Sequence, residues 1–264
     1  MSKNTQFAGT ILSMRQQKLL EKYLAIYRYH SKFGRVEALK RMFSIFKDLD
    51  LFDYRHGFNT RHIKVKSLEK KTYMPYWPVF TSVALEMVKF SYNYYISAIR
   101  YSDLERKTVF VDFGAGLGKS TLVAAKTGNF DVCSGIEIDS ELVEMAQPNL
   151  QRKLVKNLNT FILQGNVELQ NDIDLFVSKL VELGIKPKES TLFIFNKNSY
   201  GPEVLENSIK LIEVHFSSIV YLYQNPIHGY VLPRLGFIEF GQDDRKTTEH
   251  KNYKYRLYFK HKYE

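Results

Sequence analysis

The sequence is poor in the residues that stabilise secreted, metal-bound or membrane-spanning proteins. Its 264 residues include a single cysteine, Cys133, which excludes an internal disulfide and leaves no cysteine set for structural zinc. No apolar run reaches the roughly 18 residues of a membrane-spanning helix, and the first residues have no apolar stretch typical of a secretory signal. We therefore expect a cytoplasmic protein with no membrane span and no metal site, in which Cys133 is a core residue.

Acidic residues are scarce at both ends of the chain. The net charge is +10; residues 1–100 hold 18 Lys and Arg against 7 Asp and Glu, residues 101–244 hold 13 against 19, and residues 245–264 hold 7 against 2. Two basic segments therefore flank an acidic central region. This distribution predicts an anionic partner, which could be nucleic acid, an acidic protein or a membrane surface. The alternative is that the basic helices are simply solvated.

Hydrophobic periodicity divides the chain into a helical front and an alternating region. Apolar side chains recur at spacings of three and four in residues 13–50, which predicts helices, whereas residues 53–60 have the polar composition of a loop. A further helix is expected over residues 81–95. We expect a basic helical extension at residues 1–72 and the main domain at residues 73–264.

From residue 108 onward the pattern alternates between strands and helices, which is typical of a parallel sheet covered on both faces. The last two strands follow each other without a helix, so they should pair antiparallel. The expected strands are residues 108–113, 132–137, 160–164, 191–196, 217–223, 236–240 and 253–260.

A glycine turn follows the first of these strands, which ends in Asp112-Phe113. Gly114, Gly116 and Gly118 then let the backbone approach a ligand closely, and the helix that follows offers free N–H groups. A phosphate loop needs a glycine at position 113, and a dinucleotide fingerprint needs its third glycine at position 119. Neither spacing fits, although Gly-Lys-Ser at 118–120 leaves a phosphate-loop nucleotidase as an alternative.

Asp-x-Gly-x-Gly-x-Gly over residues 112–118, followed by a strand that ends in Glu137, resembles the first two motifs of class I S-adenosylmethionine (SAM) methyltransferases. The resemblance implies an α/β, Rossmann-like sheet of seven strands, mostly parallel with an antiparallel last strand. It also implies that Asp112 and the three glycines form the cofactor turn and that Glu137 holds both ribose hydroxyls. A carboxylate suits that role because it accepts two hydrogen bonds at once.

Two later segments resemble this family as well. Asn166 follows the third strand, where the resemblance implies a side chain that binds the adenine amino group. Residues 191–204, TLFIFNKNSYGPEV, look like a segment of the non-SET histone lysine methyltransferases, the disruptor-of-telomeric-silencing type. This resemblance implies that Asn196 contacts the methionine end or the methyl acceptor and that Tyr200 lines the acceptor channel. Lys197 departs from that family, which has an asparagine there.

The segment before the glycine turn is also similar to that group. Residues 73–78, YMPYWP, and Thr81-Ser82 carry the similarity, so Thr81 is expected at the cofactor. Other segments look more like small uncharacterised bacterial SAM methyltransferases, and we expect the chain to be one of these. In such an enzyme the protein mainly aligns the acceptor with the sulfonium methyl and excludes water, and S-adenosylhomocysteine (SAH) is the product.

The acceptor stays open among three classes. A protein lysine fits the closest motif, RNA fits the basic flanks, and a small molecule fits the absence of a recognised nucleic-acid module. A non-catalytic SAM- or nucleotide-binding module with a basic docking arm is the alternative from another functional class.

Overall fold

The computed structural model divides the chain into two compact units, Met1–Lys47 and Asp48–Glu264. The expected boundary near residue 72 falls outside the described residues and stays a prediction, as does any role of residues 73–78. The structure describes residues 14–32, 34–60, 79–99, 106–152, 159–197, 200–243 and 254–262.

The first unit is a pair of helices, α1 (Met14–Ser31) and α2 (Arg35–Ile45). Gly34 turns the chain between them with φ 113°, a backbone angle that residues other than glycine rarely adopt. Tyr23 of α1 packs edge-on against Phe46, with 5.4 Å between ring centroids. The helical stretch expected over residues 13–50 is therefore confirmed for the residues described.

The loop expected at residues 53–60 is wrong in its first half. A π-helical turn, η1 (Phe46–Asp50), leads into a short helix, α3 (Leu51–His56), which ends at Gly57 in the left-handed conformation. Phe52 and Phe58 are buried in the core of the second unit, and this packing holds the segment in place. A helix of six residues is too short to show a helical period in the sequence.

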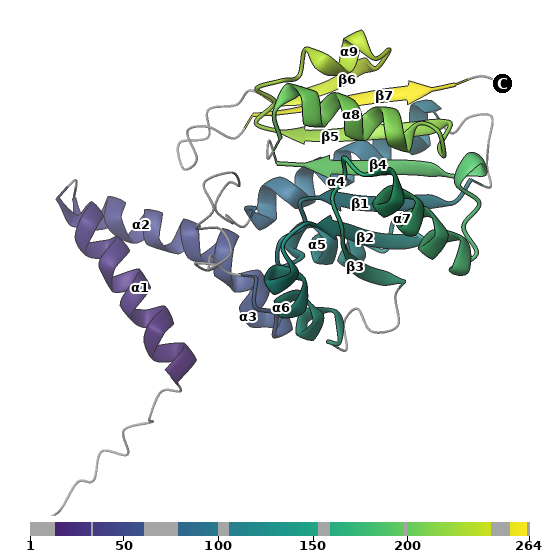
Figure 1. Ribbon diagram of the computed structural model, residues 1–264. Helices are drawn as coiled ribbons and strands as arrows, with labels where there is room; N and C mark the ends of the chain where they lie inside the picture. The colour runs from purple at the N-terminus through teal and green to yellow at the C-terminus, as the bar shows by residue number, and fades with distance from the viewer. Residues whose placement is uncertain are drawn as a thin grey trace, which may run out of the picture. The chain divides into compact units, whose positions relative to one another are not determined.

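The second unit is built on a seven-stranded sheet with the order β3-β2-β1-β4-β5-β7-β6 (Figure 1). Of these strands only β7 runs antiparallel, to both β5 and β6, and the remaining pairs are parallel. The expected sheet is confirmed, with strand bounds within two residues of those expected at most ends. The strands are β1 (Thr108–Phe113), β2 (Val132–Glu137), β3 (Thr160–Gln164), β4 (Thr191–Asn196), β5 (Ser218–Gln224), β6 (Ile238–Asp243) and β7 (Tyr255–His261).

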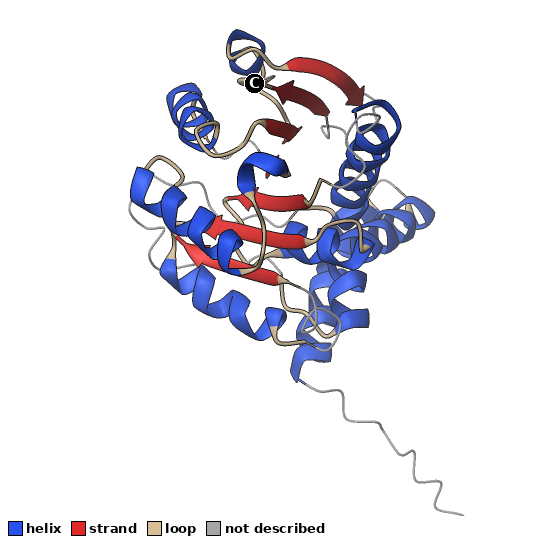
Figure 2. Cartoon of the chain, turned by 90° about the vertical axis from the view of Figure 1, so that its right-hand side faces the viewer, coloured by secondary structure: helices blue, strands red, loops and turns tan. Residues whose placement is uncertain are grey.

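Helices cover both faces of the sheet (Figure 2). One face carries α4 (Thr81–Tyr94) with the π-turn η3 (Tyr95–Ile99), α5 (Lys119–Thr127) and α6 (Ser140–Leu150), whose apolar residues share one core cluster. The other face carries α7 (Gln170–Glu182), α8 (Pro202–Ile212) and the short α9 (Val231–Arg234), which share a second cluster. A 3-10 turn, η5 (Pro187–Glu189), precedes β4.

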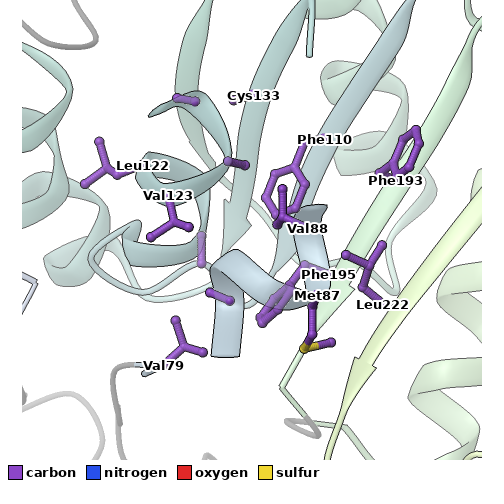
Figure 3. Close-up of a cluster of buried hydrophobic side chains, with 14 of the residues drawn as sticks. Val79, Met87, Val88, Phe110, Leu122, Val123, Cys133, Phe193, Phe195 and Leu222 are labelled. Atoms are coloured by element: carbon purple, nitrogen blue, oxygen red, sulfur yellow. The ribbon is translucent and has the colours of Figure 1, made fainter. Parts of the chain in front are cut away.

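The cluster on the α4 face joins that helix to the middle of the sheet. Met87 and Val88 of α4 lie against Phe195 of β4 and Leu222 of β5 (Figure 3), and all four are buried. Parallel strands whose two faces are both buried are typical of such a sheet. In the part of the chain that the structure describes, no helix is long and apolar enough to cross a membrane.

Candidate functional site

The glycine turn lies at the carboxyl end of β1 and bends back onto β2. Gly114, Gly116 and Gly118 have φ values of 85°, 53° and 80°, a region that L side chains rarely adopt. The N–H groups of Gly114 and Ala115 both donate to the carbonyl of Ile136, at 2.9 and 3.1 Å. The turn is thus hydrogen-bonded to the strand that presents Glu137.

Glu137 ends β2 directly beside this turn. Its carboxylate accepts from the N–H of Gly116 at 2.7 Å and from the N–H of Asp139 at 3.0 Å, and only 7% of the residue is exposed. Burial raises the pKa of Glu137, and these backbone hydrogen bonds oppose the rise. Each carboxylate oxygen can accept a further bond, so the side chain can still bind a pair of hydroxyls.

Asp112 lies at the same edge, one strand away, and is almost fully buried. The hydroxyl of Ser120 in α5 donates to its carboxylate. Burial raises the pKa of Asp112 to about 7, while the Ser120 hydrogen bond opposes the rise. Lys197 lies close enough for charge interaction with Asp112, and burial lowers the pKa of its amine to about 8. A carboxyl group with a raised pKa and an amine with a lowered pKa therefore lie close to each other.

Asn196 ends β4 and is completely buried. Its amide Nδ2 donates to the hydroxyl of Tyr221 in β5 at 3.0 Å. Tyr200 is partly buried and packs against the core cluster that contains Tyr221. Burial raises the pKa of Tyr200 well above its usual value, and the carboxylates of Glu137 and Asp112 contribute to the rise. Tyr200 therefore lies within electrostatic reach of both cofactor-side acids.

Asn166 follows β3 in a turn next to Glu137. The N–H of Gly165 donates to the carbonyl of Glu137 at 2.9 Å, and the Asn166 side-chain oxygen accepts from the N–H of Glu168 at 3.0 Å. The N–H of Asn166 in turn donates to Asp172 at 2.7 Å. The amide oxygen expected to bind an adenine amino group is thus already held by one bond, and an oxygen with two lone pairs can take a second.

Thr81 begins α4, the helix that packs over β4 and β5. Its hydroxyl oxygen is buried and has no hydrogen-bond partner among the described residues. The structure therefore brings Asp112, the glycine turn, Glu137 and Asn166 together around the ends of β1 to β3. Asn196, Tyr200 and Thr81 belong to the neighbouring segments.

The residues that hold α3 onto this site could not be found from the sequence. Lys119, directly after the glycine turn, has its ammonium 3.8 Å from the Asp53 carboxylate, and each side chain is only 2% exposed. The Asp53 carboxylate also accepts from the N–H and the hydroxyl of Thr60. Lys119 thus faces a buried carboxylate, an arrangement unlike the phosphate-binding lysine of the nucleotidase alternative.

A second contact fixes the same segment. The side chain of Asn149 in α6 accepts from the N–H of Asn59 at 2.8 Å and donates to the carbonyls of Asn59 and Leu117, both at 3.2 Å. Leu117 belongs to the glycine turn, so residues 53–60 are tied to it from two sides. No local pattern indicates this, because Asn59 and Asn149 are 90 residues apart.

Comparison with known proteins extends these observations. The family described as "Histone methylation protein DOT1" matches residues 82–214. An uncharacterized RNA methyltransferase of Caldanaerobacter subterraneus subsp. tengcongensis is 31% identical over 132 residues, which is 50% of this chain and 26% of that protein. The chain thus spans about a quarter of that relative's length.

Two solved structures are similar at low identity. The magnesium protoporphyrin IX methyltransferase of Synechocystis PCC 6803 with bound SAH is 13% identical, with 84% of this chain and 100% of that chain covered and a TM-score of 0.46. The precorrin-6y C5,15-methyltransferase of Geobacter metallireducens GS-15 is 16% identical, with 81% and 98% covered and a TM-score of 0.44.

The family match begins in α4 and ends just after α8, about half of the chain. It includes the glycine turn, Glu137 and the segment from Asn196 to Val204, which are the residues on which the resemblance was based. The chain therefore belongs to the family of the histone methylation protein DOT1, within the class I SAM-dependent methyltransferases.

Proposed function

We propose that this protein transfers a methyl group from SAM to an amine, and that the amine belongs to a protein lysine. The match to the family of the histone methylation protein DOT1 carries the proposal, because it includes both the glycine turn and the strand end at Asn196. The coarser activity, methyl transfer, is common to the family and to the similar proteins named above.

The residues at the ends of β1 to β3 fit the cofactor. Glu137 would accept the ribose hydroxyls, Asn166 would accept from the adenine amino group, and the glycine turn would pass under the methionine part. The fit rests on the buried Glu137 carboxylate, which is hydrogen-bonded to Gly116 of that turn and retains acceptor capacity. When bound, SAM supplies an electrophilic methyl group, so the protein needs no strong acid.

The acceptor side has to hold a neutral amine in line with that methyl group. An ammonium is not a nucleophile, and a partly dry, aromatic environment favours its deprotonated form. Tyr200 and Tyr221 provide such an environment next to Asn196. Asp112, with a pKa of about 7, is partly ionised at neutral pH and can accept the proton, whereas Lys197, with a pKa of about 8, is mostly protonated there.

RNA is the second candidate acceptor. The relative from Caldanaerobacter is described as an RNA methyltransferase, and residues 1–100 carry 18 basic side chains against 7 acidic ones. A basic extension that docks onto an anionic partner would serve either acceptor. It would bind an acidic protein surface around a target lysine, or the phosphates of an RNA backbone. Residues 1–72 are proposed as that extension and residues 73–264 as the catalytic domain, while the cytoplasmic location stays a prediction.

The first test is calorimetric titration with SAM, SAH, NAD and ATP. We expect binding of SAM and SAH only, and loss of both in the Gly116→Arg variant, whose side chain would occupy the turn. Gly201→Ala is the matched control, because Gly201 has φ −67° and an added Cβ would meet no atom within 4 Å. Binding of ATP or NAD in place of SAM would overturn the proposal.

A second test identifies the acceptor. Methyl-labelled SAM is incubated with the protein and either lysine-rich proteins or bulk RNA, and the label in each fraction is counted. Label in protein that is lost after prior chemical methylation of lysines supports the proposal. Label in RNA alone would replace the lysine acceptor with an RNA acceptor.

A further inference from the structure

Gln224, the last residue of β5, is a fully buried side-chain amide with no hydrogen-bond partner in the described part of the chain. Its relative exposure is 0%, and among the described residues neither its Oε1 nor its Nε2 has a partner. The Thr81 hydroxyl is buried and unpartnered in the same way. Buried polar groups in native proteins are nearly always paired, and an unpaired one destabilises the fold. Two such groups call for a ligand that pairs with them.

The two side chains lie at the same edge of the sheet. Gln224 stands opposite Tyr255 in the β5–β7 register, and the Tyr255 hydroxyl donates to Glu86 of α4 at 3.3 Å. At its other end α4 leads into Tyr95, whose hydroxyl accepts from Thr191 at the start of β4. α4 therefore runs antiparallel to β4 and β5, and its first turn, with Thr81, lies at their carboxyl ends.

Gln224 also faces α4. Side chains alternate between the two faces along a strand, and Val220 and Leu222 belong to the core cluster on the α4 face. Leu222 lies against Met87 of α4 (Figure 3). The next side chain on that face is Gln224, so its amide is directed toward the first turn of α4.

In the strand order this position lies beyond β4, on the acceptor side of the site; the Gln224 side chain is on the α4 face of the sheet, and Tyr221 is on the opposite face. The residues proposed to hold SAM lie at the ends of β1 to β3, whereas β4 with Asn196 separates β1 from β5. Neighbouring strands are about 4.8 Å apart, and β5 lies two strands from β1. Gln224 is therefore roughly 10 Å from the end of β1, where the glycine turn begins, and β4 with Asn196 lies between them. Such a distance suits a group of the acceptor molecule that is a few bonds from the reacting amine.

The chemistry of a carboxamide selects the ligand. Its Nε2 donates and its Oε1 accepts, so an ammonium, a carboxylate or a phosphate satisfies only half of it. A second amide satisfies both halves, and the Thr81 hydroxyl can donate or accept beside it. We propose that Gln224, with Thr81, binds a peptide bond next to the target lysine, so that Thr81 serves the acceptor and not, as the resemblance implied, the cofactor; this rests on the proposed protein-lysine acceptor.

Other unpartnered groups do not suggest a second site. The Thr160 hydroxyl also lacks a partner among the described residues, but it is a single group at the amino end of β3. After Gln224 the chain is held rigidly: Asn225 has φ 51°, and its N–H donates to the carbonyl of Lys254 at 2.7 Å. The backbone directly after Gln224 is thus held by a hydrogen bond to the residue before β7.

A stability measurement separates a ligand-binding amide from a structural one. Gln224→Leu should raise the melting temperature by about 2–4 °C, since it removes unpaired polar atoms at nearly constant volume. Asn149→Leu is the matched control and should lower it, because that buried amide is paired through both its oxygen and its nitrogen. A lowered melting temperature in Gln224→Leu would show a structural role and overturn the proposal.

A binding measurement tests the ligand. Protein labelled with ¹⁵N-glutamine and saturated with SAH is titrated with N-acetyl-lysine methylamide and, separately, with adenosine. The side-chain NH₂ signals of Gln224, identified by their loss in Gln224→Leu, should move with the peptide probe. Movement with adenosine alone, or no movement with either probe, would overturn the proposal.

Calorimetry with SAM keeps the two hypotheses apart. Gln224→Leu should bind SAM with the affinity of the unmodified protein, because Gln224 lies beyond Asn196. If neither protein binds SAM, the methyltransferase proposal fails whatever the effect on stability. If only the variant loses SAM affinity, the acceptor-side assignment of Gln224 fails.

Discussion

The two halves of the sheet edge differ in how their polar groups are paired. Around β1 and β2, Glu137 is bonded to Gly116 and Asp139, and Asp112 is bonded to Ser120. At the end of β5, Gln224 has no hydrogen-bond partner among the described residues, although it is more deeply buried. The first half is organised before any ligand binds, whereas the second half keeps its hydrogen-bonding capacity for a ligand.

The difference follows from the ligands proposed for each half. A cofactor of constant structure is bound well by a rigid, fully hydrogen-bonded turn, because little ordering remains to be done on binding. An acceptor has to be discriminated from similar molecules, and buried groups that are unpaired without it reject those that cannot pair with them.

Lys119→Met should cause the largest loss, because it removes the cation from a buried ion pair. The Asp53 carboxylate would remain buried without its nearest positive charge, which typically costs about 3–5 kcal/mol of unfolding free energy. Urea denaturation measures the loss. Lys210→Met is the control, since its pair with Glu206 is exposed, on a helix surface, and such pairs contribute about 0.3–0.5 kcal/mol. Equal stability of the two variants would mean that the ion pair does not hold α3 onto the turn.

Asp112→Asn should remove a pH dependence of stability. The pKa of Asp112 is about 7 in the folded protein, whereas an unperturbed aspartate has a pKa of 3.8. Between these values the folded state binds the extra proton, so the unfolding free energy falls as pH rises, by up to about 1.4 kcal/mol per pH unit. The raised pKa of Glu137 acts in the same direction.

Urea denaturation at pH 5, 6 and 7 checks this prediction. The variant should show a flatter profile than the unmodified protein and a gain in stability that grows toward pH 7. Parallel profiles would show that Asp112 is already ionised in the folded protein over this range.

Much of the fold was predictable because each strand carries its own local signal. The runs at residues 108–113, 132–137, 160–164 and 191–196 are rich in apolar residues, and the structure places strands at these same residues. The turn at Gly114, Gly116 and Gly118 was equally predictable, since glycines permit the positive φ values that such a tight turn adopts. The antiparallel pairing of the last two strands followed from the absence of a helix between them.

The tertiary contacts of the site were not predictable. Asp53 meets Lys119 across 66 residues, and Asn59 meets Asn149 across 90. Such pairs depend on how helices pack, and single-sequence periodicity contains no information about that. Gln224 was not singled out for the same reason, because a glutamine at a strand end looks ordinary until its burial and its missing partners are known. The roles assigned to individual cofactor and catalytic residues stay predictions.

Glu137→Gln should weaken SAM binding while preserving the shape of the site. The amide keeps one acceptor oxygen, but it replaces the other with a donor that faces the N–H of Gly116 or Asp139. Hydrogen bonds to charged groups contribute about 1.5–3 kcal/mol, which corresponds to an affinity loss of roughly 10- to 150-fold. Calorimetry measures it, and Gln224→Leu at the other half of the edge provides the comparison. Equal affinity of both variants would remove Glu137 from the cofactor site.

Tyr221→Phe should give the smallest effect. It removes one hydrogen-bond partner from the buried Asn196 amide at the end of β4, whereas the Gln224 amide at the end of β5 has no partner among the described residues. The variant removes the hydroxyl that accepts from Asn196 Nδ2 at 3.0 Å and leaves that buried donor without this partner. One such hydrogen bond contributes about 0.5–1.5 kcal/mol, so the urea midpoint should fall slightly. SAM affinity should stay unchanged, because Tyr221 lies on the acceptor side of Asn196. Tyr230→Phe, at a residue that is 55% exposed, should change neither quantity. A loss of SAM affinity in Tyr221→Phe would mean that the cofactor half of the sheet edge extends across β4. The boundary between the cofactor half and the acceptor half would then lie at β5.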